Sequence, residues 1–223
     1  NTLNQCLPIE PLMNYSYSQS IYTSDEIGSG GLITSIGFQY SIGNVNFFSN
    51  NNQIVLYAGT VHRDRFNSIT DWVPLDSMQT VFLGTLNQEW FSSVLPGQGW
   101  LTIPLTTAFN YSGTGNLIIA LDENTPGSSS SNNDFYCTTC STPRSIEFHS
   151  MTVNPDPANP PEAYAGNPRS YRPNLRLEIQ TVVYAPHSPT PPDNAIDIAL
   201  TPVFEWQSNA QSWDVFFAPL NQT

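Results

Sequence analysis

Lysine is absent from this chain of 223 residues, and six arginines are its only strong cations. Eighteen aspartates and glutamates leave a formal net charge of -12 at pH 7. Nucleic acids and anionic membrane surfaces are bound through lysine and arginine, so this charge argues against both as partners. An acidic surface without lysine instead suits divalent cations and neutral partners such as glycans.

Charged residues are scarce as well, at 11% of the chain, whereas about a quarter is usual in globular proteins. Uncharged polar residues, proline and glycine take their place. No apolar stretch is long enough to act as a signal peptide or to insert into a membrane. We therefore expect a secreted or cell-surface protein, seen either as a processed product or as a fragment of something longer.

Helical periodicity is nearly absent, whereas a period of two recurs along the chain. Alternate residues from Leu32 to Ile42 are large or β-branched, which is typical of a strand with one buried face. Residues 54–58 are apolar on both faces, as expected in the middle of a sheet. Further strands are predicted at 17–23, 80–86, 100–105, 117–121, 144–149 and 175–179.

Turns rich in glycine, proline and asparagine separate these segments, for example at residues 28–31, 50–52 and 96–97. About eight strands with such punctuation predict an all-β protein, an antiparallel β-sandwich of jelly-roll type. Helices and strands do not alternate, which argues against a nucleotide-binding open sheet.

The carboxy-terminal region differs in composition from the rest. We assign residues 1–183 to the sandwich, 184–192 to a proline-rich, semi-rigid linker, and 193–223 to an incomplete immunoglobulin- or fibronectin-like β segment. Strands are predicted there at 194–200, 202–207 and 212–218. A complete domain of that type needs about 100 residues and seven strands. The segment therefore begins a longer domain or completes a sheet in another molecule.

The framework of strands and turns resembles secreted jelly-roll adhesin modules of Bacteroidota, related to the gingipain cleaved-adhesin domains. The similarity covers roughly residues 11–181, and the tail resembles the start of a fibronectin type III repeat. It implies a modular exported protein and identifies no ligand. The segments that carry it include 17–22, 33–38, 55–60, 70–75, 99–103, 116–123, 154–161 and 171–175.

Cysteine is rare, with three residues. Cys137 and Cys140 form a C-x-x-C pair, and Cys6 lies far from them. With His149 as the remaining ligand this is a poor match to a zinc site, and the βαβ context of a redox motif is missing. We predict a structural disulfide, either between Cys137 and Cys140 or between Cys6 and one of them. One such disulfide leaves the third cysteine unpaired, so a disulfide between two chains is a further alternative.

Asp122 and Glu123, with Asp134 across a serine-rich loop, offer oxygen ligands for calcium, the only metal that the pattern favours. No calcium-loop spacing accompanies them, and solvated carboxylates at a strand end are the simpler interpretation. We therefore expect no cofactor, with calcium as the one ion to test.

Aromatic side chains raise the alternative of glycan binding, because their faces stack on sugar rings. Trp90 and Phe91 lie in a polar, acidic stretch and are the best candidates for an exposed pair, together with Trp72. Most aromatic residues of a sandwich belong to its core, so this site rests on analogy with other sandwich proteins.

Catalytic motifs of hydrolases, metalloproteases and nucleotide-binding proteins are missing from the sequence. Asp25 and Glu26 are neighbours, as are Asp122 and Glu123, and neighbouring residues of a strand point to opposite faces, so neither pair flanks one glycosidic bond. This argument does not apply to pairs of carboxylates that are far apart in the sequence.

Three functions follow, in decreasing order of expectation. The first is a non-enzymatic structural or adhesive surface protein. It assembles into a head-to-tail filament when terminal strands pair with other copies of the chain or with neighbouring sandwich domains. The second is a carbohydrate-binding module of a larger secreted protein. The third is an ancillary domain of a secreted hydrolase.

Overall fold

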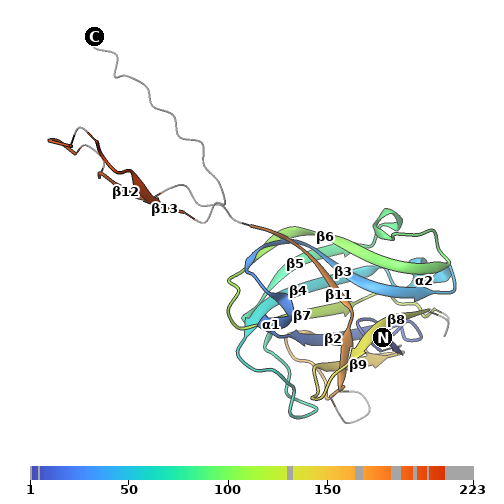
Figure 1. The fold of residues 1–223 in the computed structure, drawn as a ribbon. Helices are drawn as coiled ribbons and strands as arrows, with labels where there is room; N and C mark the ends of the chain where they lie inside the picture. Colours follow the sequence, from blue (N-terminus) through green and yellow to red (C-terminus); the bar gives the residue numbers. More distant parts are fainter. Residues whose placement is uncertain are drawn as a thin grey trace. The chain divides into compact units, whose positions relative to one another are not determined.

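A computed structural model describes residues 2–4, 6–129, 133–163, 168–181, 187–192, 195–199 and 201–208. The chain forms two compact units, Asn1–Gln180 and Thr181–Thr223. The first unit is a β-sandwich of two antiparallel sheets (Figure 1), which confirms the predicted all-β sandwich fold.

Sheet A has six strands, with the long strand β3 at its centre. One edge of β3 pairs with β6, and the other edge pairs first with β11 and then with β8. Strand β8 in turn pairs with β1 and β10. The strands are β1 (Thr2–Asn4), β3 (Gly31–Ile42), β6 (Gly97–Tyr111), β8 (Asn133–Thr139), β10 (Tyr171–Pro173) and β11 (Leu175–Gln180).

Sheet B has five strands in the order β5-β4-β7-β2-β9. Its strands are β2 (Tyr15–Tyr22), β4 (Gln53–Val61), β5 (Met78–Thr85), β7 (Asn116–Glu123) and β9 (Ser145–Ser150). Four short helical segments lie in the connections: α1 (Ser24–Ile27), α2 (Asn46–Asn50), η1 (Leu75–Ser77) and η2 (Gln88–Trp90).

The alternation in the sequence produces the main core. Ile36, Phe38 and Tyr40 of β3 point toward sheet B, where they pack with Leu56 of β4 and Leu121 of β7. Each large side chain buried in this way contributes about 1.5–3 kcal/mol. The segment predicted to be apolar on both faces is β4, which lies between β5 and β7.

The outer face of sheet B is also covered, by the loop that follows β4. The fully buried Gln19 of β2 holds this loop in place. Its Nε2 donates to the carbonyl oxygen of Val73 (2.9 Å) and to Oη of Tyr17 (2.9 Å), and its Oε1 accepts from the backbone N–H of Val73 (2.7 Å). One amide therefore satisfies both backbone groups of Val73, which have no access to water.

Replacing Gln19 with leucine should lower the free energy of unfolding by about 2–4 kcal/mol. The backbone N–H and C=O of Val73 would stay buried without partners, and each unsatisfied group costs about 1–3 kcal/mol. Urea unfolding of the two proteins measures the difference. The matched control is Gln79→Leu on the exposed face of β5, with an expected change within about 0.5 kcal/mol. Equal changes in both variants would contradict the role of Gln19.

Near β9 the interior between the two sheets is polar. Ser16, Ser18 and Ser20 of β2 are buried there. Oγ of Ser18 donates to the carbonyl oxygen of Pro8 (2.8 Å), and the hydroxyls of Ser20 and Ser145 are 2.8 Å apart. The first bond attaches the amino-terminal segment to sheet B, and the second joins β2 to β9 within that sheet. Both satisfy groups that would otherwise be costly to bury.

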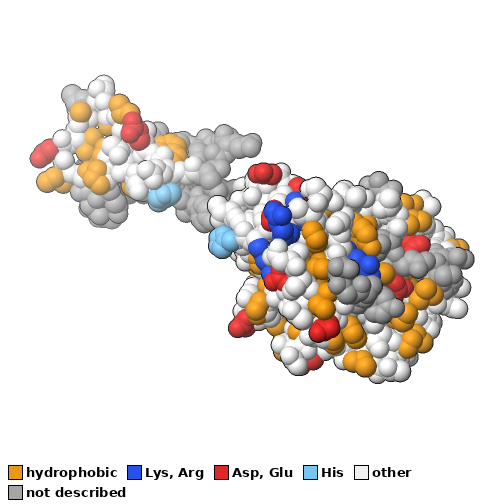
Figure 2. Space-filling model, turned by 90° about the horizontal axis from the view of Figure 1, so that it is seen from below, with side chains coloured by type: hydrophobic (Ala, Val, Ile, Leu, Met, Phe, Trp, Pro, Cys, Tyr) orange, Lys and Arg blue, Asp and Glu red, His pale blue; other side chains and the backbone are white. Residues whose placement is uncertain are grey.

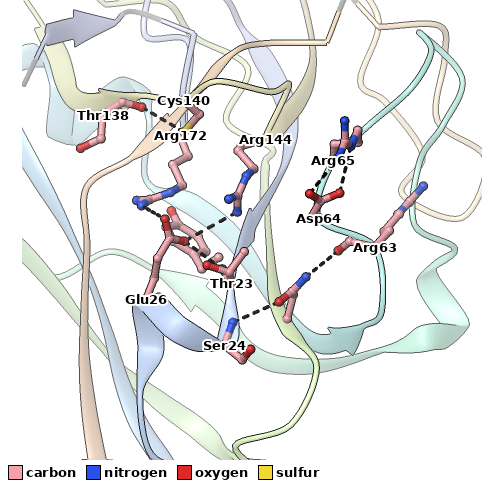
Figure 3. A network of polar contacts seen from close by, with 12 residues as sticks. Thr23, Ser24, Glu26, Arg63, Asp64, Arg65, Thr138, Cys140, Arg144 and Arg172 are labelled. Atoms are coloured by element: carbon pink, nitrogen blue, oxygen red, sulfur yellow. Dashed lines mark hydrogen bonds and ion pairs between the residues drawn. The ribbon is translucent and has the colours of Figure 1, made fainter.

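Helix α1 joins the two sheets through Glu26 (Figure 3). Its carboxylate accepts from the backbone N–H of Thr23 (2.8 Å) and from Nη2 of Arg172 in β10 (2.6 Å), and lies 3.6 Å from Nη1 of Arg144. Partial burial acts to raise the pKa of Glu26, but the bonds from Thr23 and Arg172 lower it further than burial raises it. No local pattern in the sequence indicates this contact between distant segments.

Three strands of sheet A escaped prediction: β1, β8 and β10. Strand β8 has a weak pattern, because Phe135 and Cys137 are its only large buried side chains and the rest are polar. Strands β1 and β10 have three residues each, too few for any periodicity.

The second unit follows its predicted strands in part: β13 (Glu205–Gln207) lies within the strand expected at 202–207. Residues 195–199, expected within a strand, form none, and 212–218 lie outside the described residues. Strand β12 (His187–Thr190) occupies part of the expected linker and pairs with β13 (Glu205–Gln207). Pro189 is tolerated because the pairing is irregular between His187 and Thr190, where no ladder bond from it is needed.

Candidate functional site

The structure places Trp72 away from Trp90 and Phe91, the other two aromatic residues proposed for glycan binding. The Trp72 ring stacks on Tyr17 on the outer face of sheet B, with centroids 5.2 Å apart, and its Nε1 donates to the carbonyl oxygen of Pro161 (2.8 Å). Phe91 is buried edge-on against Tyr40 in the core, with centroids 5.3 Å apart. Both side chains pack within the fold: Trp72 is partly buried, and Phe91 is 8% exposed.

Trp90 is different, because it borders an open groove beside sheet A. The groove has a volume of about 400 Å³, and side chains of β3, β6, β11 and η2 line it. Its residues are Ser35, Glu89, Trp90, Phe91, Ser92, Trp100, Thr102, Pro104 and Glu178. We call it the Trp90–Trp100 groove.

Two indole rings, two carboxylates and several hydroxyls therefore border one groove, and Arg176 adds a cation. Its guanidinium lies over the ring of Trp100, 4.3 Å from the centroid. Carboxylates and hydroxyls hydrogen-bond to sugar hydroxyls, and indole rings pack on the apolar faces of sugars. The sequence drew attention to Trp90, but Trp100 and Glu178 become its neighbours only through the pairing of β3 with β6 and β11.

The three carboxylates proposed for calcium do not come together. Asp122 and Glu123 are neighbours on β7 and point to opposite faces, whereas Asp134 lies on β8 in the other sheet. Oδ2 of Asp122 accepts from Nδ2 of Asn124 (2.8 Å), and Oε1 of Glu123 accepts from the backbone N–H of Thr125 (2.7 Å). The set offers no common point for an ion.

These carboxylates are not solvated either. Asp122 is 4% exposed and Glu123 is 1% exposed. Burial, as the largest cause, raises the pKa of Asp122 to about 6 and that of Glu123 to about 8. It also raises the pKa of Asp134. The interpretation as solvated strand-end carboxylates is therefore wrong for Asp122 and Glu123.

No disulfide joins any two of the three cysteines, all of which lie in the described residues. Sγ of the buried Cys137 lies 3.9 Å from the carbonyl oxygen of Leu7, and Sγ of Cys140 lies 3.5 Å from that of Thr138. Burial raises the pKa of Cys137 to about 12 and also raises that of Cys140. Both thiols are therefore protonated at neutral pH and weak as nucleophiles.

A second polar cluster was missed by the sequence analysis. Cys6 and Glu10 of the amino-terminal segment meet His149 of β9, and their ligand atoms all lie within 4.8 Å of one another. Nδ1 of His149 lies 2.9 Å from Oε2 of Glu147, whose Oε1 accepts from Nε of Arg169 (3.0 Å). The available signal was the placement of Glu147 and His149 two residues apart on one face of a predicted strand.

Each arginine side chain lies beside a carboxylate or an aromatic ring. Five of the six form ion pairs with carboxylates, and Arg176 lies over Trp100. On the face shown in Figure 2, blue arginine side chains lie close to red carboxylates. This pairing agrees with the argument from composition against nucleic acid as a partner.

Comparison with known proteins gives no family for this chain: no protein-family profile matches it, and neither does any curated protein. In the part of the chain that the structure describes, no helix is long and apolar enough to cross a membrane.

Proposed function

We propose that this chain is a non-enzymatic, extracellular structural and adhesive protein whose second unit joins it to a further copy by strand pairing. The observation that carries the proposal is the exposed apolar surface of that unit. Ile196 is 85% exposed and Val203 is 70% exposed, and Ile198 and Phe204 are about half exposed. Figure 2 shows hydrophobic side chains scattered over this unit.

Strand pairing supports the same proposal. Among the described residues β12 and β13 pair only with each other. A two-stranded sheet is marginally stable in water, and its outer edges carry backbone groups ready to pair with another strand. Contact with a second copy would bury the apolar side chains and extend the sheet. A contact repeated head to tail builds an open fibre.

Association of the full-length chain tests this proposal. Light scattering after gel filtration should show oligomers that grow with protein concentration, and Val203→Asp should shift them to monomers. The same substitution at Val94, which is 90% exposed on the sandwich, is the matched control and should leave association unchanged. A chain that stays monomeric at every concentration would overturn the proposal.

Glycan binding is the second candidate, and the Trp90–Trp100 groove favours it. Its aromatic rings lie beside carboxylates and hydroxyls, as in many sugar sites. Glu89 and Glu178 are both exposed, whereas the acid of a glycosidase is normally kept protonated by an apolar pocket. The groove therefore fits binding better than hydrolysis.

Trp100→Ala should reduce the affinity for a glycan found by array screening by about tenfold or more, since loss of one stacking contact costs about 1–3 kcal/mol. Isothermal titration of wild type and variant measures the change. Trp206→Ala in β13 removes a tryptophan elsewhere and serves as the control. Screening without any hit that depends on Trp90 or Trp100 would remove this candidate.

A further inference from the structure

The buried cluster of Cys6, Glu10 and His149 carries the strongest inference beyond adhesion. Glu10 and His149 are more than nine-tenths buried, and Cys6 is partly buried. Among the described residues, this is the only group of three or more histidine, cysteine, aspartate and glutamate side chains whose ligand atoms lie this close together.

The chemistry of the three ligands selects the class of ion. A thiolate sulfur and an imidazole nitrogen are ligands for zinc and related transition metals, whereas calcium and magnesium take oxygen ligands. Three protein ligands leave one position of a tetrahedral ion to water. We propose that Cys6, Glu10 and His149 bind one divalent transition-metal ion of the zinc class.

Neighbouring side chains orient the histidine for this role. Nδ1 of His149 is engaged by Glu147 at 2.9 Å, so the ligand atom is Nε2. Arg169 holds the same carboxylate from the other side, with Nε at 3.0 Å from Oε1. A carboxylate that fixes the second nitrogen of a ligating histidine is the usual arrangement in zinc sites. Glu147 and Arg169 are therefore positioning residues.

The local charge balance also favours a divalent cation. Arg169 offsets Glu147, whereas the ion pairs found among the described residues include none with Glu10. The thiol of Cys6 and the carboxylate of Glu10 hydrogen-bond to each other. Metal binding replaces that bond: the thiol proton leaves to solvent, a sulfur–metal bond forms, and the two negative ligands neutralise the ion.

The position of the site predicts a stabilising effect. Cys6 follows β1, which pairs with β8 of sheet A, while His149 belongs to the outer strand β9 of sheet B. A metal bound to both residues links the amino-terminal segment to β9, which is an edge strand of sheet B. Because the ion binds only the folded state, its binding energy adds to stability.

Cobalt titration of the full-length chain tests the site, after treatment with chelator and a thiol-free reductant. We expect one Co²⁺ per chain, an ultraviolet thiolate-to-cobalt charge-transfer band, and loss of the band when Zn²⁺ displaces cobalt. Cys6→Ser should abolish the band. Glu147→Gln should weaken cobalt binding by about 10–100-fold. The melting temperature should rise with Zn²⁺ in the wild type and not in Cys6→Ser.

Cys140→Ser and His62→Gln are the matched controls and should leave the band intact, and Cys6→Ser should keep its cooperative unfolding. A band that survives Cys6→Ser, or that disappears in Cys140→Ser, places the metal elsewhere and overturns the proposal. The absence of any charge-transfer band in the wild type also overturns it, and leaves the cluster as a hydrogen-bonded structural network.

Discussion

Replacing Arg169 with methionine is expected to lower the free energy of unfolding by about 3–5 kcal/mol in metal-free protein. Glu147 is 2% exposed, and its carboxylate is shared between Arg169 and His149. Removing the arginine leaves a buried carboxylate with one weaker partner, and breaking a buried ion pair from one side costs about this much. Urea unfolding of wild type and variant measures the change.

The double variant Arg169→Met with Glu147→Gln distinguishes two causes of the lost stability. One is the unpaired buried charge of Glu147, and the other is the loss of packing around the arginine side chain. The glutamine is neutral, so the double variant should recover at least about half of the loss. The matched surface control is Arg65→Met, because Arg65 and its partner Asp64 are each about half exposed, and such pairs are worth about 0–1 kcal/mol. An Arg169 variant no less stable than the Arg65 variant would contradict the account of a buried charge.

Stability should fall by about 3–6 kcal/mol as the pH rises from about 4.5 to about 8.5. Burial raises the pKa of Asp122 from 3.8 to about 6 and that of Glu123 from 4.5 to about 8. The folded state therefore holds these protons more tightly than the unfolded chain does. Their contribution is complete below the unfolded pKa values and is lost as the pH passes through the folded ones.

The variants Asp122→Asn and Glu123→Gln, combined, should flatten this slope, because neither amide titrates. Asp64→Asn changes a carboxylate of the exposed pair and should leave the slope unchanged. Glu26 acts in the opposite sense, since its lowered pKa means that its contribution is lost as the pH falls. Urea unfolding across the pH range measures both effects. Stability that rises between pH 4.5 and 8.5 (about the interval set by these pKa values) would contradict the assignment.

Much of the sandwich follows from the sequence, because an alternating pattern states which face of a strand is buried. It succeeds for β3, whose large side chains face the core, and for β4, which is apolar on both faces. It fails for β8, where backbone pairing with β1, β3 and β10 compensates for a weak apolar face. Pairing of that kind leaves no local trace in the sequence.

The candidate sites depend on contacts between distant segments, which no local pattern encodes. Trp90 and Trp100 border one groove because η2 lies against β6. Cys6 and His149 approach one another because the amino-terminal segment inserts where the serines of β2 leave a polar interior. Asp122 and Glu123 were expected in solvent, but β7 is a central strand of sheet B, and loops cover its outer face.

Electron microscopy of the native material, together with the mass of the intact polypeptide, tests most directly whether the second unit joins copies of this chain. The account predicts regular fibres built from this polypeptide, with the sheet of β12 and β13 continued by a strand of the next copy. Separate particles whose β12–β13 sheet has no neighbour would contradict it, and would leave the Trp90–Trp100 groove as the better guide to function.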